Sequence, residues 1–173
     1  MNSFPNGVGE IGNDGCLCHG ASNSDTKISI SGLPEKFESA TNYSLQLTIS
    51  NEEIARNNQS AQGGFRIIVN IGVLYFNNSE GIIIDDGWTH QESSNQQRIW
   101  NFSWLSPDDN TTMARLLVYG NAVNGNQKQT GDNWNDLEVY IPGVQNFDPI
   151  PTETMTEHEL ETFDRTMLFT GLI

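Results

Sequence analysis

The chain has 173 residues, which is enough for one domain with a buried core. It carries 22 acidic and 8 basic residues, giving a formal net charge of −14. This balance argues against nucleic-acid binding, because phosphate groups are bound by concentrated positive charge. The sequence contains no run of 18 or more apolar residues that would predict a membrane-spanning helix.

Residues 1–25 form an irregular N-terminal segment in this prediction, since they show no strand pattern. Four glycines lie between positions 7 and 15, followed closely by Cys16 and Cys18. Because the segment shows no strand that could pair in a sheet, we expect the two cysteines to organise it.

Residues 26–143 alternate between apolar and polar side chains, the pattern of half-buried strands. Asn, Gly and Pro separate the alternating runs, and no helical pattern interrupts them. The fold class predicted is all-β, an immunoglobulin-like antiparallel β-sandwich of seven or eight strands with Trp100 and Trp104 in its core. The expected strands are 27–31, 45–49, 65–71, 73–76, 81–85, 100–104, 116–119 and 137–141, with 73–76 and 81–85 joined as one hairpin.

Residues 144–173 are predicted to be a linker followed by a short C-terminal helix. Thr156 and Glu159 have the spacing of a capping box, and Leu160, Phe163 and Met167 follow at helical intervals. This helix either docks on the domain or begins a membrane anchor that continues beyond Ile173.

The most informative motif is Cys16-Leu17-Cys18-His19. It is one residue shorter than C-x-x-C-H, in which both cysteines form thioethers to haem and the histidine ligates the iron. The missing residue brings double covalent attachment into question. Two alternatives remain open: a disulfide or free thiols, and a zinc site formed by Cys16, Cys18 and His19 with a fourth ligand.

A second haem ligand would come from elsewhere in the chain. The candidates are His90, His158, Met113, Met155 and Met167. The competing interpretation of His90 is a partly buried histidine hydrogen-bonded within a loop.

Several other residues have a candidate role near a haem or a metal. Trp88 and Trp134 are predicted to lie in loops that shield a haem edge. Asp132 and Asp136 are candidate calcium ligands, although solvated acids in a turn are the simpler interpretation.

Several short motifs, taken together and in order, resemble the reeler domain and, more closely, its prokaryotic relatives, the choice-of-anchor V extracellular domains. The similarity covers roughly residues 12–141. The motifs are Gly32-Leu33-Pro34, Gly63-Gly64-Phe65, Thr89-His90, Trp100-x-Phe102-x-Trp104, and Asn121–Gly125 with Gly131-Asp132.

The resemblance implies an immunoglobulin-like sandwich, secretion, and anchoring by a segment C-terminal to the domain. It also implies a C-x-x-C-H-type element before the first strand and a threonine–histidine pair before the tryptophan strand. These match Cys16–His19 and Thr89-His90, so the resemblance favours His19 and His90 as axial ligands of a c-type haem.

Two functions from different classes follow. The first is an extracytoplasmic haem-binding module that transfers one electron to a redox protein partner. The alternative is a non-catalytic adhesion or recognition module for a cell-surface ligand, with a disulfide or zinc at the cysteine turn. An enzyme is disfavoured, because no hydrolase, metalloprotease or phosphate-binding motif is present.

A secreted or cell-surface location also agrees with five N-x-S/T triplets, which are candidate glycosylation sites. They begin at Asn42, Asn58, Asn77, Asn101 and Asn110.

Overall fold

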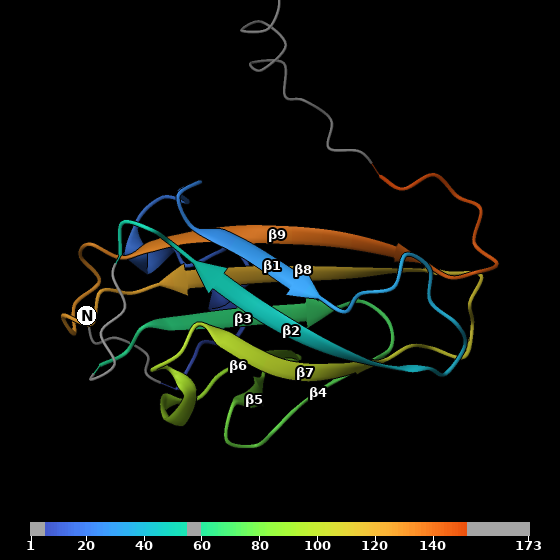
Figure 1. Ribbon diagram of the computed structural model, residues 1–173, viewed down its shortest axis with the longest axis horizontal. Coiled ribbons are helices and arrows are strands. Elements are labelled where there is room, and N and C mark those ends of the chain that lie inside the picture. The colour runs from blue at the N-terminus through green and yellow to red at the C-terminus, as the bar shows by residue number, and fades with distance from the viewer. Residues whose placement is uncertain (1–5, 55–59, 152–173) are drawn as a thin grey trace, which may run out of the picture.

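The computed structural model describes residues 6–54 and 60–151. Within them two antiparallel sheets lie face to face, which confirms the predicted β-sandwich (Figure 1). The four-stranded sheet has the order β1 (Lys27–Ser31), β2 (Asn42–Ser50), β7 (Ile99–Leu105), β4 (Val73–Phe76). The five-stranded sheet has the order β5 (Gly81–Ile84), β6 (Gly87–His90), β3 (Gly63–Val69), β8 (Met113–Ala122), β9 (Asn133–Pro142). Three short 3-10 turns complete the described chain: η1 (Glu10–Gly12), η2 (Leu17–His19) and η3 (Glu92–Ser94).

The core between the sheets is built by the alternation of each strand. Trp100 and Trp104 of β7 are fully buried, as predicted. Phe65 of β3 joins the two sheets, because its ring lies 5.0 Å from Trp100 and 5.0 Å from Phe76 of β4. Aromatic pairs at these separations add to the free energy of burial, so this cluster holds the sandwich together.

The predicted hairpin of residues 73–76 and 81–85 is wrong. β4 pairs with β7 in one sheet, whereas β5 pairs with β6 in the other, so the chain crosses between sheets after Phe76. The true hairpin joins β5 to β6 through Asp85 and Asp86, which both have positive φ, as a two-residue type I′ turn requires. β6 was missed because it is short and lacks a clear apolar alternation.

The N-terminal segment is held by side chains of the five-stranded sheet rather than by its cysteines, whose thiols are free. Nε of Arg66 donates to Oδ1 of Asn13 at 2.9 Å, and the Tyr119 hydroxyl donates to the Asn13 carbonyl. Trp134 donates from Nε1 to the Gly20 carbonyl at 2.8 Å. The segment therefore lies against this sheet, at the left end of the molecule in Figure 1.

Two tryptophans expected in loops lie instead in strands. Trp134 belongs to β9 and packs over the N-terminal segment, whereas Trp88 belongs to β6 and packs 5.1 Å from the ring of Phe76. The prediction contains no strand for Trp88, and it begins the strand of Trp134 at residue 137 instead of Asn133.

The predicted helix after Thr156 lies outside the described residues. Among residues 6–54 and 60–151 no helix has the length and apolarity needed to cross a membrane.

Candidate functional site

A cavity of about 740 Å³ lies at the end of the sandwich where β3 begins and β8 ends, against the N-terminal segment. Its wall includes all four residues that the sequence indicated as a haem site: Cys16, Cys18, His19 and His90. The first three come from the N-terminal segment, while His90 ends β6. The fold therefore brings together groups that lie far apart in the chain.

The cysteines lie in and just before the 3-10 turn η2. Within this turn the His19 amide donates to the Cys16 carbonyl at 2.8 Å. Both thiols are free; Cys16 is half-buried and Cys18 is exposed. Burial, with a smaller contribution from Cys18, raises the pKa of Cys16 to about 12, so this thiol stays protonated at neutral pH.

Of the alternatives for the cysteines, the structure shows the free thiols and not the disulfide. Residues two apart in a 3-10 turn project in different directions, since three residues complete each turn, and no disulfide links Cys16 and Cys18. Across the described part of the chain, no group of three or more His, Cys, Asp and Glu side chains is arranged to hold a metal ion.

His19 is oriented by Asp132, which precedes β9. Its Nδ1 donates to Oδ2 of Asp132 at 2.9 Å, and the Asp132 side chain is only 2% exposed. The other carboxylate oxygen accepts the Asn124 amide at 3.0 Å. Asp132 is thus a buried partner of His19, which corrects the prediction of a solvated turn acid, whereas Asp136 is exposed.

His90 lies on a strand beside β3, not in a loop. The Phe65 amide donates to its Nδ1 at 3.2 Å, and the Phe65 carbonyl oxygen lies 3.4 Å from the same nitrogen. Burial lowers the pKa of His90 to about 4, so its ring is neutral at pH 7. A neutral imidazole has a lone pair available for a metal.

Gly64 makes room for the His90 ring. A Cβ at this position would lie 2.5 Å from Cε1 of His90, closer than atoms can approach without displacement. The pair Gly63-Gly64 at the start of a strand was the available signal, since glycine inside a strand marks a close approach.

Asn121 is a site residue that the sequence prediction missed. It lines the cavity from β8 and is 6% exposed, yet its buried Oδ1 has no hydrogen-bond partner among the described residues. Buried polar atoms are nearly always satisfied, so an orphaned one in a cavity wall points to a ligand or water there. At the rim, Ile11 and Leu17 are 71% and 61% exposed, leaving apolar surface for a ligand to cover.

The other predicted ligands are not placed at this site. Met113 begins β8, at the opposite end of that strand from Asn121, and does not line the cavity. Met155, Met167 and His158 lie outside the described residues.

The candidate glycosylation sites lie mainly on the four-stranded sheet. Asn42, Asn77 and Asn101 are exposed, Asn110 is half-buried, and Asn58 lies outside the described residues. Asn101 lies between the buried Trp100 and Phe102 on β7, and Asn42 begins β2 beside the half-buried Tyr43, so both face outward from this sheet. The cavity, by contrast, is lined by strands of the other sheet.

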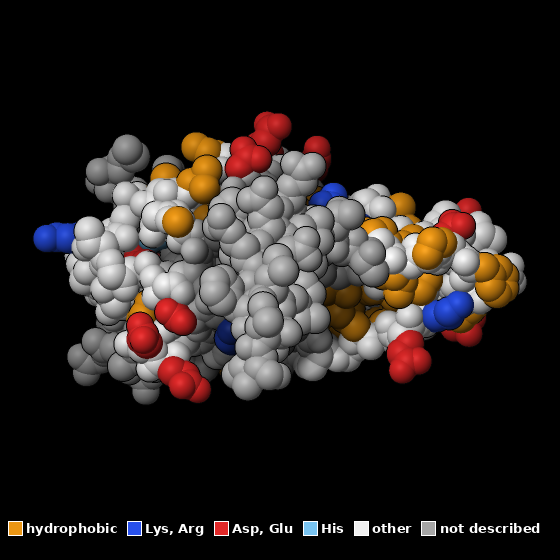
Figure 2. All heavy atoms as spheres, turned by 90° about the horizontal axis from the view of Figure 1, so that it is seen from above, with side chains coloured by type: hydrophobic (Ala, Val, Ile, Leu, Met, Phe, Trp, Pro, Cys, Tyr) orange, Lys and Arg blue, Asp and Glu red, His pale blue; other side chains and the backbone are white. Residues whose placement is uncertain are grey.

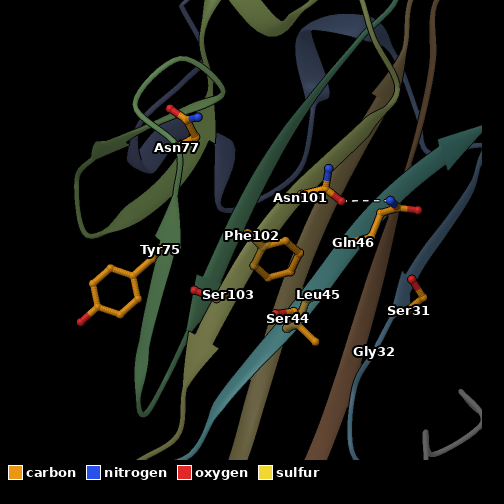
Figure 3. Close-up of a pocket in the computed structure, with 10 residues that line it drawn as sticks. All are labelled: Ser31, Gly32, Ser44, Leu45, Gln46, Tyr75, Asn77, Asn101, Phe102 and Ser103. Atoms are coloured by element: carbon orange, nitrogen blue, oxygen red, sulfur yellow. Dashed lines mark hydrogen bonds between the residues drawn. The ribbon is translucent and has the colours of Figure 1, made fainter.

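A second, more open hollow of about 420 Å³ lies on the outer face of the four-stranded sheet (Figure 3). It includes Asn101, whose side chain accepts a hydrogen bond from Gln46 at 2.9 Å, and none of the predicted haem-site residues. Its ten lining residues carry no charged side chain.

Acidic side chains are spread over both ends of the face seen in Figure 2 rather than gathered in one patch. The negative charge therefore does not mark a single binding surface on that face, and it favours solubility.

No family model and no curated protein matches this chain. Among solved structures, the human F-spondin reeler domain is similar with a TM-score of 0.46 and 13% identity, over 72% of this chain and 96% of that one. The Reelin-N domain of F-spondin is similar with a TM-score of 0.45 and 15% identity, over 70% of this chain and 88% of that one.

A conjugative transposon lipoprotein from Bacteroides eggerthii gives a TM-score of 0.43 and 11% identity, over 69% of this chain and 98% of that one. Reeler domains, the family that the sequence resembles, are thus among the similar structures. At these identities the function has to be inferred from the chain's own cavity.

Proposed function

We propose that this chain binds a c-type haem in the cavity, between His19 and His90, and acts as an extracytoplasmic one-electron carrier. The observation that carries the proposal is that Cys16, Cys18, His19 and His90 all line one cavity. The sequence motif named the first three residues and the family resemblance named His90, which reaches the same cavity from the distant strand β6.

The cavity suits a planar, largely apolar group in several respects. Its volume of about 740 Å³ lies within the range of cofactor sites. The exposed aliphatic side chains of Ile11 and Leu17 give it an apolar rim. The orphaned Oδ1 belongs to an amide that can turn to present its NH₂ group, so Asn121 can bond either a donor or a carboxylate of the ligand.

Each histidine has one ring nitrogen occupied and one available. Nδ1 of His19 is bonded to Asp132, and Nδ1 of His90 lies beside the Phe65 backbone. In His19 this leaves the Nε2 lone pair for iron, which matches the way metal-bound histidines are usually held. In His90, Nε2 offers its lone pair in the tautomer whose Nδ1 proton faces the Phe65 carbonyl, because an Nδ1 that accepts the Phe65 amide leaves the proton on Nε2. Bound haem would supply a reversible one-electron change at iron, and the chain would set its potential through the two imidazoles and burial.

Cys18 is the better placed cysteine for covalent attachment, because it is exposed whereas Cys16 is half-buried. In thioether formation the S–H bond adds across a vinyl group: a C–S bond forms, the hydrogen goes to the neighbouring carbon, and no atom leaves. The protein mass therefore rises by the full mass of haem. We expect Cys18→Ser to abolish attachment and Cys16→Ser to retain it.

Expression with c-type haem maturation machinery, followed by absorption spectroscopy, tests the proposal. Wild type should show a Soret band and the spectrum of a six-coordinate, low-spin haem. His19→Ala should lose most of the bound haem, and His90→Ala should change the coordination. His158→Ala is the matched control and should leave the spectrum unchanged. A wild-type protein that binds no haem, or a His90→Ala spectrum identical to wild type, would contradict the proposal.

The partner of this module would be a redox protein outside the cytoplasm, and any membrane attachment would come from outside the sandwich. The triplets at Asn42, Asn77 and Asn101 are exposed, as glycosylation would require, which supports an extracytoplasmic location. None of the three asparagines lines the cavity.

The alternative function, recognition of a cell-surface ligand, has one observation in its favour. The open hollow on the four-stranded sheet presents uncharged hydrogen-bonding side chains, among them Ser44, Gln46 and Ser103, and Tyr75 at its edge is 50% exposed (Figure 3). Such a surface suits a neutral ligand rich in hydroxyl groups. A glycan array tests it: Tyr75→Ala should abolish any binding seen with wild type, and no wild-type binding would contradict it.

A further inference from the structure

Asp132 is a carboxylate that the fold buries at some cost. Its side chain is 2% exposed, and transferring a charged group out of water is unfavourable unless it is paired and hydrogen-bonded. Its hydrogen-bond partners among the described residues are the Asn124 amide and Nδ1 of His19. One oxygen is therefore anchored to the backbone, and the other is directed at the imidazole.

The anchoring oxygen fixes where the second oxygen lies. Asn124 and Asp132 belong to the connection between β8 and β9, in which the Asn124 amide side chain donates to the Thr130 carbonyl at 3.0 Å. The carboxylate is thus held by a loop with its own hydrogen bonds, whereas His19 is on a short turn of the N-terminal segment. Asp132 is therefore the member of this pair that is anchored by a second hydrogen bond, and His19 is the group it orients.

We propose that Asp132 is the positioning residue for His19: it holds the proton on Nδ1, presents Nε2 to the ligand in the cavity, and makes the imidazole a more electron-rich ligand. The effect of Asp132 on iron rests on the proposed haem function, whereas the hydrogen bond between Asp132 and His19 does not. Carboxylate partners of metal-bound histidines raise ligand basicity, and their loss commonly weakens metal affinity by about 10- to 100-fold.

A simpler role for the pair would be to fasten the N-terminal segment to the sandwich. The two roles differ in whether the negative charge of Asp132 is needed. A fastening role needs only a hydrogen bond, whereas a positioning role needs the negative carboxylate to hold the Nδ1 proton and to stabilise the oxidised iron.

The test compares Asp132→Asn with Asp136→Asn. The second variant removes the same charge four residues along the chain, from an exposed side chain. Two measurements are made: the tautomer of His19 in haem-free protein, by nitrogen-15 NMR of the ring, and the midpoint potential of the haem-loaded protein. Denaturant unfolding of each variant shows that the fold is kept.

We expect wild-type His19 to carry its proton on Nδ1, and Asp132→Asn to shift the population toward the Nε2-protonated form. The midpoint potential should rise in Asp132→Asn and change much less in Asp136→Asn. A wild-type ring protonated on Nε2, or equal shifts in potential in the two variants, would overturn the inference.

The NMR measurement separates this inference from the proposed function. A wild-type protein that takes up no haem but shows the Nδ1 tautomer, lost in Asp132→Asn, would refute the haem proposal while supporting the pairing.

Discussion

Different kinds of side chain fill the interior of the sandwich and line the cavity beside it. Between the sheets, Trp100, Trp104 and Phe65 fill the space with apolar rings, and the burial is nearly complete. At the cavity, the wall contains two histidines, two thiols and an orphaned amide oxygen, and its rim exposes Ile11 and Leu17. The first region maximises packing and stability, whereas the second keeps polar groups and open volume that packing alone would have eliminated. Polar groups that line an open volume in this way indicate a binding site.

The largest effect on stability should come from the interior. Trp100→Ala removes a fully buried ring and is expected to lower the free energy of unfolding by about 3–5 kcal/mol. Urea unfolding measures this, with Tyr75→Ala as the control on the exposed face, expected within about 0.5 kcal/mol of wild type. A loss for Trp100→Ala no larger than for Tyr75→Ala would mean that this ring is not in the core.

Arg66 links the two regions, and its loss should release the N-terminal segment. Its buried guanidinium donates to Asn13, to Val8 and to backbone carbonyls of the β5–β6 hairpin. Burial lowers the pKa of Arg66, partly offset by the negative charges of Asp85, Asp86 and Glu10. Arg66→Met should cost about 3 kcal/mol, because several carbonyls lose a charged donor.

Hydrogen exchange should show where this loss is felt. Amides of residues 8–20 are expected to lose protection in Arg66→Met before those of β2 and β7. The matched control is Arg115→Met, which breaks exposed interactions with Glu138 and Tyr140 and should cost less than about 1 kcal/mol. Uniform loss of protection over the whole chain would contradict a local role for Arg66.

The buried histidine should make the haem-free protein less stable in acid. The pKa of His90 is 6.5 when unfolded and about 4 when folded, so between these values the unfolded state binds more protons. Stability is therefore full above pH 6.5 and is lost as the pH falls toward 4, by about 2–3 kcal/mol from this group. Comparing urea unfolding of wild type and His90→Gln from pH 7 to pH 4 isolates the effect. Equal pH dependence in the two proteins would contradict it.

Filling the space beside His90 with a methyl group should change the free energy of unfolding less, and its effect should be local to the cavity. In Gly64→Ala the new Cβ would meet the imidazole at 2.5 Å, so the ring has to move. We expect a cost of about 1–2 kcal/mol and an altered haem spectrum. Gly20→Ala offers a contrast, because no atom lies within 4 Å of a Cβ there, although its φ of +98° adds backbone strain. An unchanged spectrum for Gly64→Ala would show that His90 is not a ligand.

The strand pattern was predictable where apolar and polar residues alternate, as in Trp100–Trp104. β6 was not, because Gly87-Trp88-Thr89-His90 is too short to show a period, and its partner β5 was therefore assigned to the wrong hairpin. The cysteine motif identified one side of the cavity, and only the resemblance pointed to His90.

The sequence indicated Asp132 only as a candidate calcium ligand or a solvated turn acid, and it did not single out Asn121 as a site residue. Acids and amides are common in turns and at strand ends, and nothing in their neighbours shows burial. Their roles depend on long-range contacts: His19 reaches Asp132 across 113 positions of the chain.

The central claim is that the cavity holds an iron porphyrin attached near His19. The most direct measurement is the intact mass of wild-type protein made with haem maturation machinery, read together with its absorption spectrum. The proposal predicts a mass increase equal to one haem, eliminated by Cys18→Ser, and a Soret band. An unmodified mass with a colourless solution would contradict it.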